Sequence, residues 1–396
     1  MATNPITKPA APRLESIDLL RGVIMVVMAL DHVRDFFQWS AVHGYDPLDL
    51  ATTTPALFFT RWITNYCAPL FSFLAGTGTY LAFKRGKSKR ELSWFLVTRG
   101  LWLIFLELTL LTWFGWQFQI TPTSYILATL WTLGWAMIVL AGLIHLPLWA
   151  TAVISIGMIV GHNALDRISP ASWGGAAPVW ELLHAGGNLS LGKFSFWVFY
   201  PLIPWPGIMG AGFCLGAVYA WPSPERRRWL YRVGAIAVVA FVVLRGFNIY
   251  GNTTPWMSQK SPLFSFLSFL DCRKYPPSLL YFLMTVGPGL LFLGYFEGRA
   301  VPGWMRPFLV YGRVPMFYYL LHIPLIHGLS KLLNVIRYGG GDFNAISSSG
   351  TPPPDAGISL GLTWLVWIGI VAALYLPCRW FADLKRRRKD AWLTYF

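Results

Sequence analysis

An apolar stretch at residues 17–37 contains the polar cluster Asp31, His32 and Asp35. A histidine between two carboxylates can be held in one tautomer with raised basicity, which is how proteins build a general base. Because ionisable side chains within a membrane-length apolar segment are costly, such a cluster indicates a functional site. The alternative is a histidine that only makes a hydrogen bond between helices. The number of polar groups in this stretch favours catalysis.

Helical periodicity places Asp18, Arg21, His32 and Asp35 on one face of this segment, at 100° per residue. His32 follows Arg21 by eleven residues, which is about 16 Å along a helix axis. A guanidinium inside a helix bundle suits a phosphate group, so Arg21 is predicted to bind an anion. An i,i+3 ion pair between Asp18 and Arg21 in the first helical turn is the alternative.

The apolar segment 306–333 repeats this combination of an arginine and a deeper histidine. Arg313 lies near one end, and His322 lies about 13 Å further along the helix. His322 could stabilise negative charge, act as a base, or make only an interhelical hydrogen bond. His327 is expected to face the loop that follows. His43 lies in the loop after the first apolar segment, where a substrate could reach it, unless it is an ordinary exposed histidine.

The composition is that of a membrane protein. Of the 396 residues, 55% are apolar and only 12% are charged, compared with about 25% charged in soluble domains. A helix needs about 20 apolar residues to cross a bilayer. Ten segments qualify, which predicts an all-α polytopic membrane protein with ten transmembrane helices: 17–37, 56–83, 93–116, 124–143, 146–163, 193–221, 229–248, 275–297, 306–333 and 357–382.

The distribution of Lys and Arg predicts the orientation in the membrane. The net charge is +15, but the basic residues gather in short clusters between apolar segments, which is typical of cytoplasmic loops and not of a nucleic-acid-binding surface. Both termini are therefore expected in the cytoplasm. The predicted organisation is a cytoplasmic tail at 1–15, a transmembrane domain at 16–384 and a basic cytoplasmic tail at 385–396.

The connections on the two predicted sides differ. The outer loops are long and rich in Gly, Pro, Ser and Trp, which favours recognition at the outer face: 38–55, 164–192, 249–274 and 334–356. The inner loops are short and basic, and the cluster at 84–90 would contact anionic lipid by default.

Proline-rich runs at 200–206 and 274–278 interrupt two apolar segments. Irregular backbone at membrane depth is tolerated where it lines a cavity, so both runs are predicted to do so. Glu107 lies in mid-segment and needs a partner, for which Arg99 or Arg245 would serve. No metal site is predicted, because the histidines lack HxxH spacing and the four cysteines lack CxxC spacing.

Four motifs occur in order along nearly the whole chain: Arg13-Leu-x-Ser-Ile-Asp-x-x-Arg-Gly22 with the Arg21-x10-His32 spacing, Tyr200-Pro-Leu-Ile-Pro-Trp205, Lys274-Tyr-Pro-Pro-Ser278, and the helix with Arg313 and His322. In this combination the sequence resembles the bacterial relatives of heparan-α-glucosaminide N-acetyltransferase. Those transmembrane acyltransferases take an acyl group from acyl-CoA on the cytoplasmic side and deliver it to a sugar or similar acceptor. The Arg-x10-His spacing also looks like the acyltransferase-3 branch.

The resemblance implies acetyl-CoA as the donor, with Arg21 on its side and His32 or His43 as the histidine of transfer. From the residues themselves, the CoA phosphates are expected near Arg21 and further basic residues of the inner side: Arg313, Lys84 and Arg85. Asp31 or Asp35 is expected to orient His32, and His322 to stabilise the oxyanion or to replace His32 as base. Direct transfer to the acceptor and a route through an acetyl-imidazole both fit these residues.

The expected acceptor is an amine or hydroxyl of a sugar-type molecule at the outer face, and the expected location is a bacterial inner membrane. A proton-coupled secondary transporter is the rival class, because buried His and Asp residues also relay protons. A homodimer stays open, since apolar surface is expected everywhere on a membrane protein.

Overall fold

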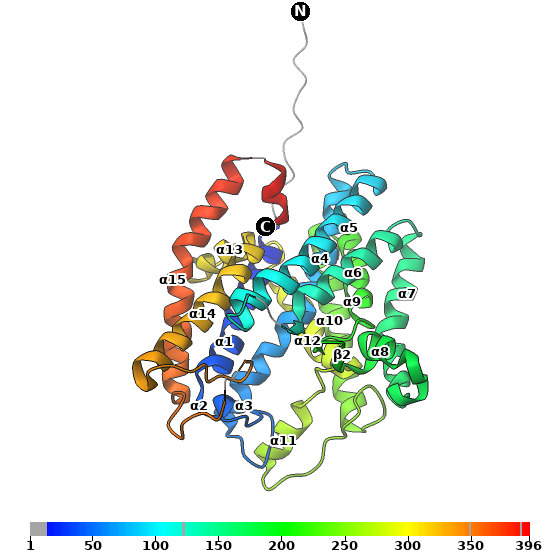
Figure 1. The fold of residues 1–396 in the computed structure, drawn as a ribbon. Coiled ribbons are helices and arrows are strands. Elements are labelled where there is room, and N and C mark those ends of the chain that lie inside the picture. The colour runs from blue at the N-terminus through cyan, green and yellow to red at the C-terminus, as the bar shows by residue number, and fades with distance from the viewer. Residues whose placement is uncertain (1–13, 121–122, 348–349, 389) are drawn as a thin grey trace, which may run out of the picture.

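The computed structural model describes residues 14–120, 123–347, 350–388 and 390–396, which are mostly helical (Figure 1). The predicted tail at 1–15 lies almost entirely outside these residues. The longer helices are α1 (Glu15–Phe37), α4 (Cys67–Lys84), α5 (Lys89–Leu106), α6 (Thr129–Leu143), α7 (Leu148–Gly161), α9 (Trp205–Val218), α10 (Ser223–Gly246), α12 (Leu279–Phe296), α14 (Pro315–Tyr338) and α15 (Leu360–Arg387). The shorter α-helices are α2 (Trp39–Val42), α3 (Pro55–Trp62), α8 (Ala177–Trp180), α11 (Pro262–Leu270) and α13 (Arg306–Arg313).

Tighter and wider helical turns connect several of these elements. The π-helix η2 (Glu107–Trp116) extends α5. The 3₁₀ and remaining π turns are η1 (Ile63–Tyr66), η3 (His162–Leu165), η4 (Pro170–Ala176), η5 (Glu181–Ala185), η6 (Gly303–Met305) and η7 (Ala391–Tyr395). π segments often occur at functional sites. The last residue of η2, Trp116, packs against His32 of α1.

The all-α prediction is wrong in one region, because three short strands form a sheet. Their order is β1-β3-β2, with β1 (Ser124–Leu127) parallel to β3 (Phe194–Val198) and β3 antiparallel to β2 (Gly187–Leu191). The predicted helices 124–143 and 193–221 therefore each begin with a strand. Both strands contain aromatic and β-branched residues, Tyr125 and Ile126 in β1 and Phe196, Trp197 and Val198 in β3, which suit a pleated, half-buried surface.

Six helices of the described residues are long and apolar enough to cross a membrane: Lys89–Trp116, Leu148–Leu165, Ser223–Gly246, Leu279–Phe296, Pro315–Tyr338 and Leu360–Arg387. The molecule is thus an integral membrane protein, while ten spans and the orientation of the termini stay predictions. α1 has 23 residues, but its charged residues set it apart from the six. The helices α6 and α9 are apolar but shorter.

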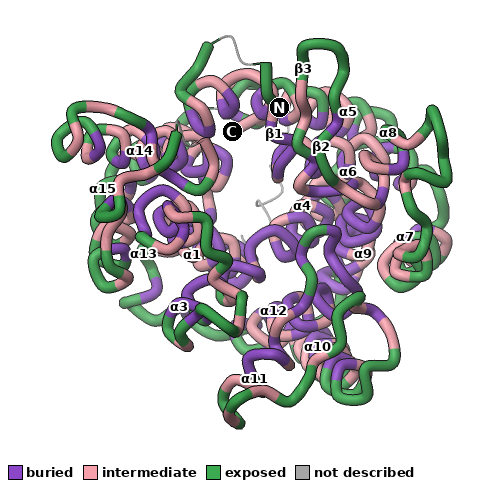
Figure 2. The backbone as a smooth tube through the Cα atoms, turned by 60° about the horizontal axis from the view of Figure 1, so that its bottom comes forward, coloured by how far each residue is buried: buried purple, intermediate pink, exposed green. Residues whose placement is uncertain are grey.

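α1 is the central helix of the fold. It packs against α4, α12, α13, α14 and α15, and most of its residues are buried, whereas α7, α10 and α15 are largely exposed (Figure 2). The exposed apolar side chains of the outer helices are the surface expected to meet lipid. The charged residues of α1 are consequently shielded from that surface by other helices.

In three pairs of helices, a glycine on each helix lets the two backbones come into direct contact. A Cβ atom on Gly22 of α1 would overlap the carbonyl oxygen of Phe308 in α13, and one on Gly312 would overlap that of Asp18. The same relation joins α4 to α9 and α5 to α6, through Gly76 with Gly212 and Gly100 with Gly134. Small residues at such crossings let helices in membranes approach closely. The first of these contacts fixes α1 against α13, and the other two fix α4 against α9 and α5 against α6.

Substituting Gly212 by alanine is expected to destabilise the fold, because the new methyl group would overlap the carbonyl oxygen of Phe73 in α4. Overpacking of this kind costs about 1–3 kcal/mol. The matched control is Gly157→Ala in α7, where a Cβ atom meets nothing within 4 Å. Thermal unfolding in detergent should show a lower midpoint for the first variant and an unchanged or slightly higher one for the second. Equal midpoints would contradict the close packing of α4 and α9.

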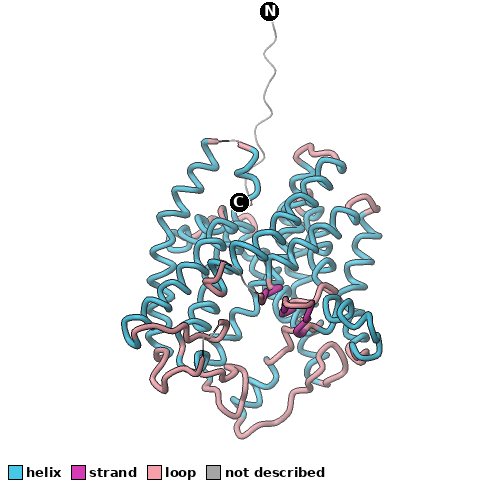
Figure 3. The backbone as a smooth tube through the Cα atoms, viewed as in Figure 1, coloured by secondary structure: helices cyan, strands magenta, loops and turns pink. Residues whose placement is uncertain are grey.

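The long loops gather at one end of the molecule. Figure 3 shows the loops around 38–55, 249–274 and 334–356 at the lower end, opposite the C-terminus. Backbone hydrogen bonds join them to α1 and to each other: the amide of Ala345 donates to the carbonyl oxygen of Asp35, and that of Trp39 donates to Ile358. The end of α1 that carries His32 is thus covered by these loops.

Candidate active site

A cavity lies beside the loop-proximal half of α1, and the space inside it that water-sized groups can occupy is about 120 Å³. Ligand pockets usually combine an apolar lining with a few polar groups, and this cavity has that character. Its polar lining is Asp31, His32, Asp35, Thr64, Thr129, Tyr200, Lys274, Tyr275 and Tyr319. Its other lining residues include Met28, Cys67, Phe71, Trp116, Leu130, Phe199, Met316 and Ile346.

The cavity prediction for the two proline-rich runs is confirmed. Tyr200 stands before α9, and Lys274 and Tyr275 stand before α12; the backbone is not helical at 200–204 or at 274–278. The hydroxyl oxygens of Tyr200 and Tyr275 lie 3.4 Å apart. Irregular backbone therefore brings polar side chains to one wall of the cavity, opposite α1.

His32 lines this cavity, and the ring of His322, which does not line it, lies beside His32 with the ring centroids 5.2 Å apart. His322 is fully buried, and its Nδ1 lies 2.8 Å from the carbonyl oxygen of Tyr319 and 3.2 Å from that of Tyr318. Since carbonyl oxygens only accept, Nδ1 carries the proton and Nε2 the lone pair. That Nε2 and the Nδ1 of His32 are buried, and within the described ranges neither has a hydrogen-bond partner.

The ring of Trp116 also packs against the ring of His32, with the ring centroids 5.2 Å apart in an edge-on arrangement. The indole N–H donates to Glu107 Oε1 at 3.0 Å. Glu107 Oε2 accepts the backbone N–H groups of Leu130 at 2.7 Å and Trp131 at 3.3 Å. Glu107 therefore fixes the tryptophan and also caps the first turn of α6, where a carboxylate is favoured by the helix dipole.

The prediction that Arg99 or Arg245 pairs with Glu107 is wrong. Arg99 donates to the carbonyl oxygen of Thr394 at 2.9 Å, and Arg245 donates to four backbone carbonyl groups at 2.7–3.0 Å. The Glu107 carboxylate accepts hydrogen bonds from neutral N–H groups and does not pair with a cation within the described residues. Nothing in the local sequence indicates that the start of α6 folds onto η2, so these donors could not be anticipated.

A buried ion network occupies the α1 wall of the cavity. Arg34, only 4% exposed, lies 2.8 Å from Asp31 and 2.5 Å from Asp35. Asp31 also faces Arg61 at 3.8 Å and Lys274 at 3.7 Å. Among the described residues, neither carboxylate accepts a hydrogen bond from His32, so the expected orienting contact is not formed. The two carboxylates act on the histidine through their charge.

His43 lies outside the residues that line this cavity. Its Nδ1 is 2.8 Å from the carbonyl oxygen of Trp39 and its Nε2 is 3.2 Å from that of Pro353. The ring also stacks on Trp39, with centroids 4.5 Å apart. His43 thus ties α2 to the loop near residue 353, whereas His32 faces the cavity.

His327 faces the outer loop 334–356, as predicted. Its Nε2 lies 2.9 Å from Asp342 Oδ2 in that loop, and its Nδ1 lies 2.6 Å from the carbonyl oxygen of Gly115 in η2. The histidine therefore connects the π-helix that carries Trp116 with the loop that carries the cavity-lining Ile346.

The basic residues predicted to bind CoA lie away from this cavity's lining. Arg21 donates to the carbonyl oxygen of Leu74 at 2.8 Å and lies 3.8 Å from the Asp18 carboxylate, so the alternative i,i+3 pair is also present. Arg313 lines a second cavity together with Arg306. Exposed basic residues end α4: Lys84 and Arg85.

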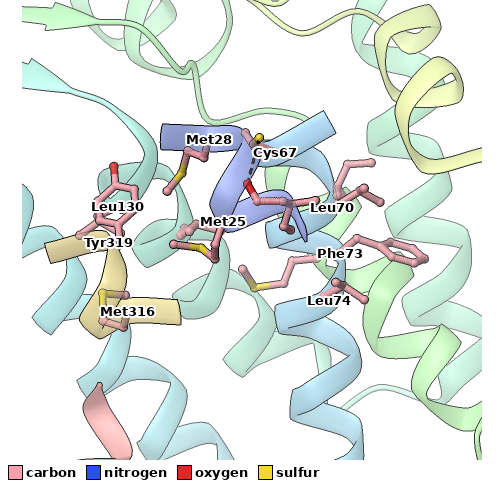
Figure 4. Close-up of a cluster of buried hydrophobic side chains, with 14 of the residues drawn as sticks. Met25, Met28, Cys67, Leu70, Phe73, Leu74, Leu130, Met316 and Tyr319 are labelled. Carbon is pink, nitrogen blue, oxygen red and sulfur yellow. Dashed lines mark hydrogen bonds between the residues drawn. The ribbon is translucent and has the colours of Figure 1, made fainter. Parts of the chain in front are cut away.

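An apolar cluster lies between the level of Arg21 and that of His32. Residues 21, 25, 28 and 32 share one face of α1 at helical spacing, and Met25 and Met28 occupy the two intermediate positions. Figure 4 shows both methionines in one cluster of buried side chains that also includes Leu74, whose carbonyl oxygen binds Arg21, and Met316, which lines the cavity. Methionine is unbranched and adaptable, so this contact is easily rearranged.

Three residues that the structure brings to the site were missed by sequence reasoning: Arg34, Trp116 and Lys274. The 274–278 run was predicted to line a cavity, yet its first residue was not assigned a role. Arg34 is three residues after Asp31, which is a spacing that pairs opposite charges on a helix. Trp116 carries no local signal, because its role depends on the fold of η2 against α1.

Comparison with known protein families gives a match that covers part of this site. Residues 13–254 match the model of the family described as heparan-alpha-glucosaminide N-acetyltransferase, catalytic. This match covers more than half of the chain and includes α1, η2, α6 and Tyr200, while Lys274 and His322 lie beyond it. Among curated proteins, none matches the sequence.

Proposed function

The chain belongs to the heparan-α-glucosaminide N-acetyltransferase catalytic family, and on that premise we propose that it moves an acetyl group from acetyl-CoA to an amine or hydroxyl of a sugar-type acceptor. Membership makes it a membrane acetyltransferase. The acetyl-CoA donor, the acceptor and the residues that act on them are the proposal. The observation that carries it is His32 on the wall of a cavity with several polar groups, with the buried ring of His322 beside it.

In this mechanism His32 is the general base. Its ring nitrogen takes the proton from the acceptor amine or hydroxyl while the acceptor attacks the thioester carbonyl carbon. The tetrahedral intermediate then collapses, the carbon–sulfur bond breaks, and the CoA thiolate receives the proton from the imidazolium. Positive charge on His32 is favoured by Asp31 and Asp35, which line the same cavity. His322 offers a lone pair at Nε2 beside that ring, so it can accept a proton from His32.

A route through an acetyl-imidazole uses the same residues. His32 would attack the thioester and carry the acetyl group on a ring nitrogen until the acceptor displaced it. Both routes use the same cavity, and in both the acceptor loses one proton and the CoA thiolate gains one. They differ in kinetics, because only the second releases CoA before the acceptor binds.

The donor is proposed to enter from the end of α1 that carries Arg21. Arg21 and Arg313 supply guanidinium groups for phosphates on that side, and the exposed Lys84 and Arg85 add positive charge. The acyl arm would follow the α1 face past Met25 and Met28, which must move aside. The acceptor would enter from the opposite, loop-covered end, consistent with a bacterial inner membrane whose outer face holds the glycan.

The test uses purified protein in detergent, acetyl-CoA and a glucosaminide. Mass spectrometry should detect acetylated product in amounts that match the CoA thiol released. Neither product nor thiol release at high enzyme concentration would overturn the proposal. Uptake of a solute driven by a proton gradient in proteoliposomes, without acetyl-CoA, would instead identify a secondary transporter.

Donor binding can be tested separately through Arg21. Calorimetry should show saturable binding of acetyl-CoA that is weakened about tenfold or more in Arg21→Ala, because a charge-assisted contact to phosphate contributes about 1.5–3 kcal/mol. Lys193→Ala is the matched control, since Lys193 lies in the exposed turn between β2 and β3. Equal affinities for both variants would remove Arg21 from the donor site.

A further inference from the structure

Lys274 is an ammonium group directed into the cavity that the mechanism above does not use. The residue is only 7% exposed, yet it lines the cavity together with His32. Its nearest anion is Asp31 Oδ2 at 3.7 Å, which is beyond hydrogen-bond length, and the Tyr275 ring centroid lies 5.2 Å away. Within the described part of the chain, none of its three N–H donors forms a hydrogen bond. A buried lysine with free donors indicates a ligand group that the donors receive.

The ion network does not need Lys274 for neutrality. Arg34 contacts both Asp31 and Asp35, and Arg61 faces Asp31 as well. The two carboxylates are therefore matched by two guanidinium groups, and Lys274 adds one further positive charge beside the cavity. Because an unpaired buried charge is costly, this surplus is most simply explained by negative charge that appears in the cavity during function.

Acyl transfer creates such a charge. When the acceptor attacks the thioester, the electron pair of the carbonyl π bond moves to oxygen, and that oxygen is negative until the carbon–sulfur bond breaks. We propose that the Lys274 ammonium binds this carbonyl oxygen and stabilises it as it becomes negative, which makes Lys274 a catalytic residue. This inference rests on the acetyl transfer proposed above. Lys274 keeps its proton throughout, and His32 carries the proton that the acceptor gives to CoA.

His322 is less suited to this task than the sequence suggested. Its only N–H points at the carbonyl oxygens of Tyr318 and Tyr319, and its Nε2 presents a lone pair. A lone pair repels an oxyanion, and His322 does not line the cavity. The hydroxyl groups of Tyr200 and Tyr275 do line it, but they are neutral donors and contact each other. The cation at Lys274 is therefore the strongest oxyanion partner on the cavity wall.

The test compares Lys274→Met with Lys274→Gln in the transfer assay. Methionine keeps most of the length of the side chain and removes every donor, and kcat is expected to fall about 10²- to 10³-fold, as on removal of one oxyanion donor. Glutamine keeps a neutral N–H donor, so its kcat should lie between those of Lys274→Met and the wild type. Acetyl-CoA affinity and the acceptor KM should change less than about threefold, since the contact forms mainly in the transition state.

The acceptors used are a glucosaminide without a carboxylate and one that carries a uronic acid. The proposal expects the same fractional loss of kcat with both. A rise in KM confined to the anionic acceptor would show that Lys274 holds the acceptor's own carboxylate, and it would overturn the proposal, as would an unchanged kcat in either variant. Lys274→Gln serves as the decisive variant if Lys274→Met does not fold. Failure of the wild type to transfer any acetyl group would instead overturn the proposed function.

Discussion

Substitution of His32 by glutamine is expected to lower the rate of acetyl transfer by about 10²- to 10⁴-fold, which is the usual contribution of a general base. Glutamine can still form hydrogen bonds, but it cannot take the acceptor's proton or carry an acetyl group. His32 also packs against Trp116 and His322, with ring centroids 5.2 Å away in each case, and glutamine fills much of that space. The measurement is the initial rate of product formation at saturating acetyl-CoA.

The control for this variant is His43→Gln. His43 contacts two backbone carbonyl groups and stacks on Trp39 outside the cavity lining, so its removal should change the rate by less than about threefold. The reverse pattern, with an active His32 variant and an inactive His43 variant, would move the catalytic role to the outer loop. Loss of activity in both would point to a structural role for each histidine.

Substitution of Arg34 by methionine should have the largest effect on stability. Arg34 is 4% exposed and contacts both Asp31 and Asp35, so its removal leaves two carboxylates, whose side chains are only 14% and 18% exposed, short of a partner. Breaking a buried ion network in this way costs about 3–5 kcal/mol. Thermal unfolding in detergent should show a greatly lowered midpoint or no folded protein.

An exposed ion pair provides the matched control for Arg34. Arg337 lies 3.1 Å from Asp355, and the side chains are 33% and 68% exposed. Because exposed pairs contribute about 0–1 kcal/mol, Arg337→Met should unfold close to the wild-type midpoint. A small, equal change in the two variants would mean that water reaches the Arg34 network and that the cavity wall is less tightly built than the structure shows.

The α1 face and the proline-rich runs were predictable from sequence because each depends on local chemistry. Helical spacing places Arg21 and His32 on one face, and proline runs at 200–206 and 274–278 interrupt apolar helices where a cavity makes this tolerable. The structure accordingly lines one cavity from α1 and from both runs. The role of His32 in transfer stays a prediction until it is measured.

The features that sequence could not supply depend on contacts between distant segments. Glu107 accepts N–H groups of α6 more than twenty residues away, and no local pattern distinguishes that partner from an arginine. The strands β1 and β3 pair across about seventy residues, within segments whose hydropathy alone resembles a membrane helix. Lys274 belongs to a recognisable run, but its free ammonium becomes apparent only when the carboxylates are seen to be matched by Arg34 and Arg61.

Acyl transfer is proposed to take place in the cavity between His32 and Lys274. A cryo-electron microscopy structure with a non-reactive thioether analogue of acetyl-CoA tests this location. We expect density for the acyl group in this cavity, with its carbonyl oxygen within hydrogen-bond distance of the Lys274 ammonium and its carbonyl carbon beside the His32 ring. Density for the acyl group confined to the second cavity at Arg306 and Arg313, with the His32 cavity empty, would contradict it.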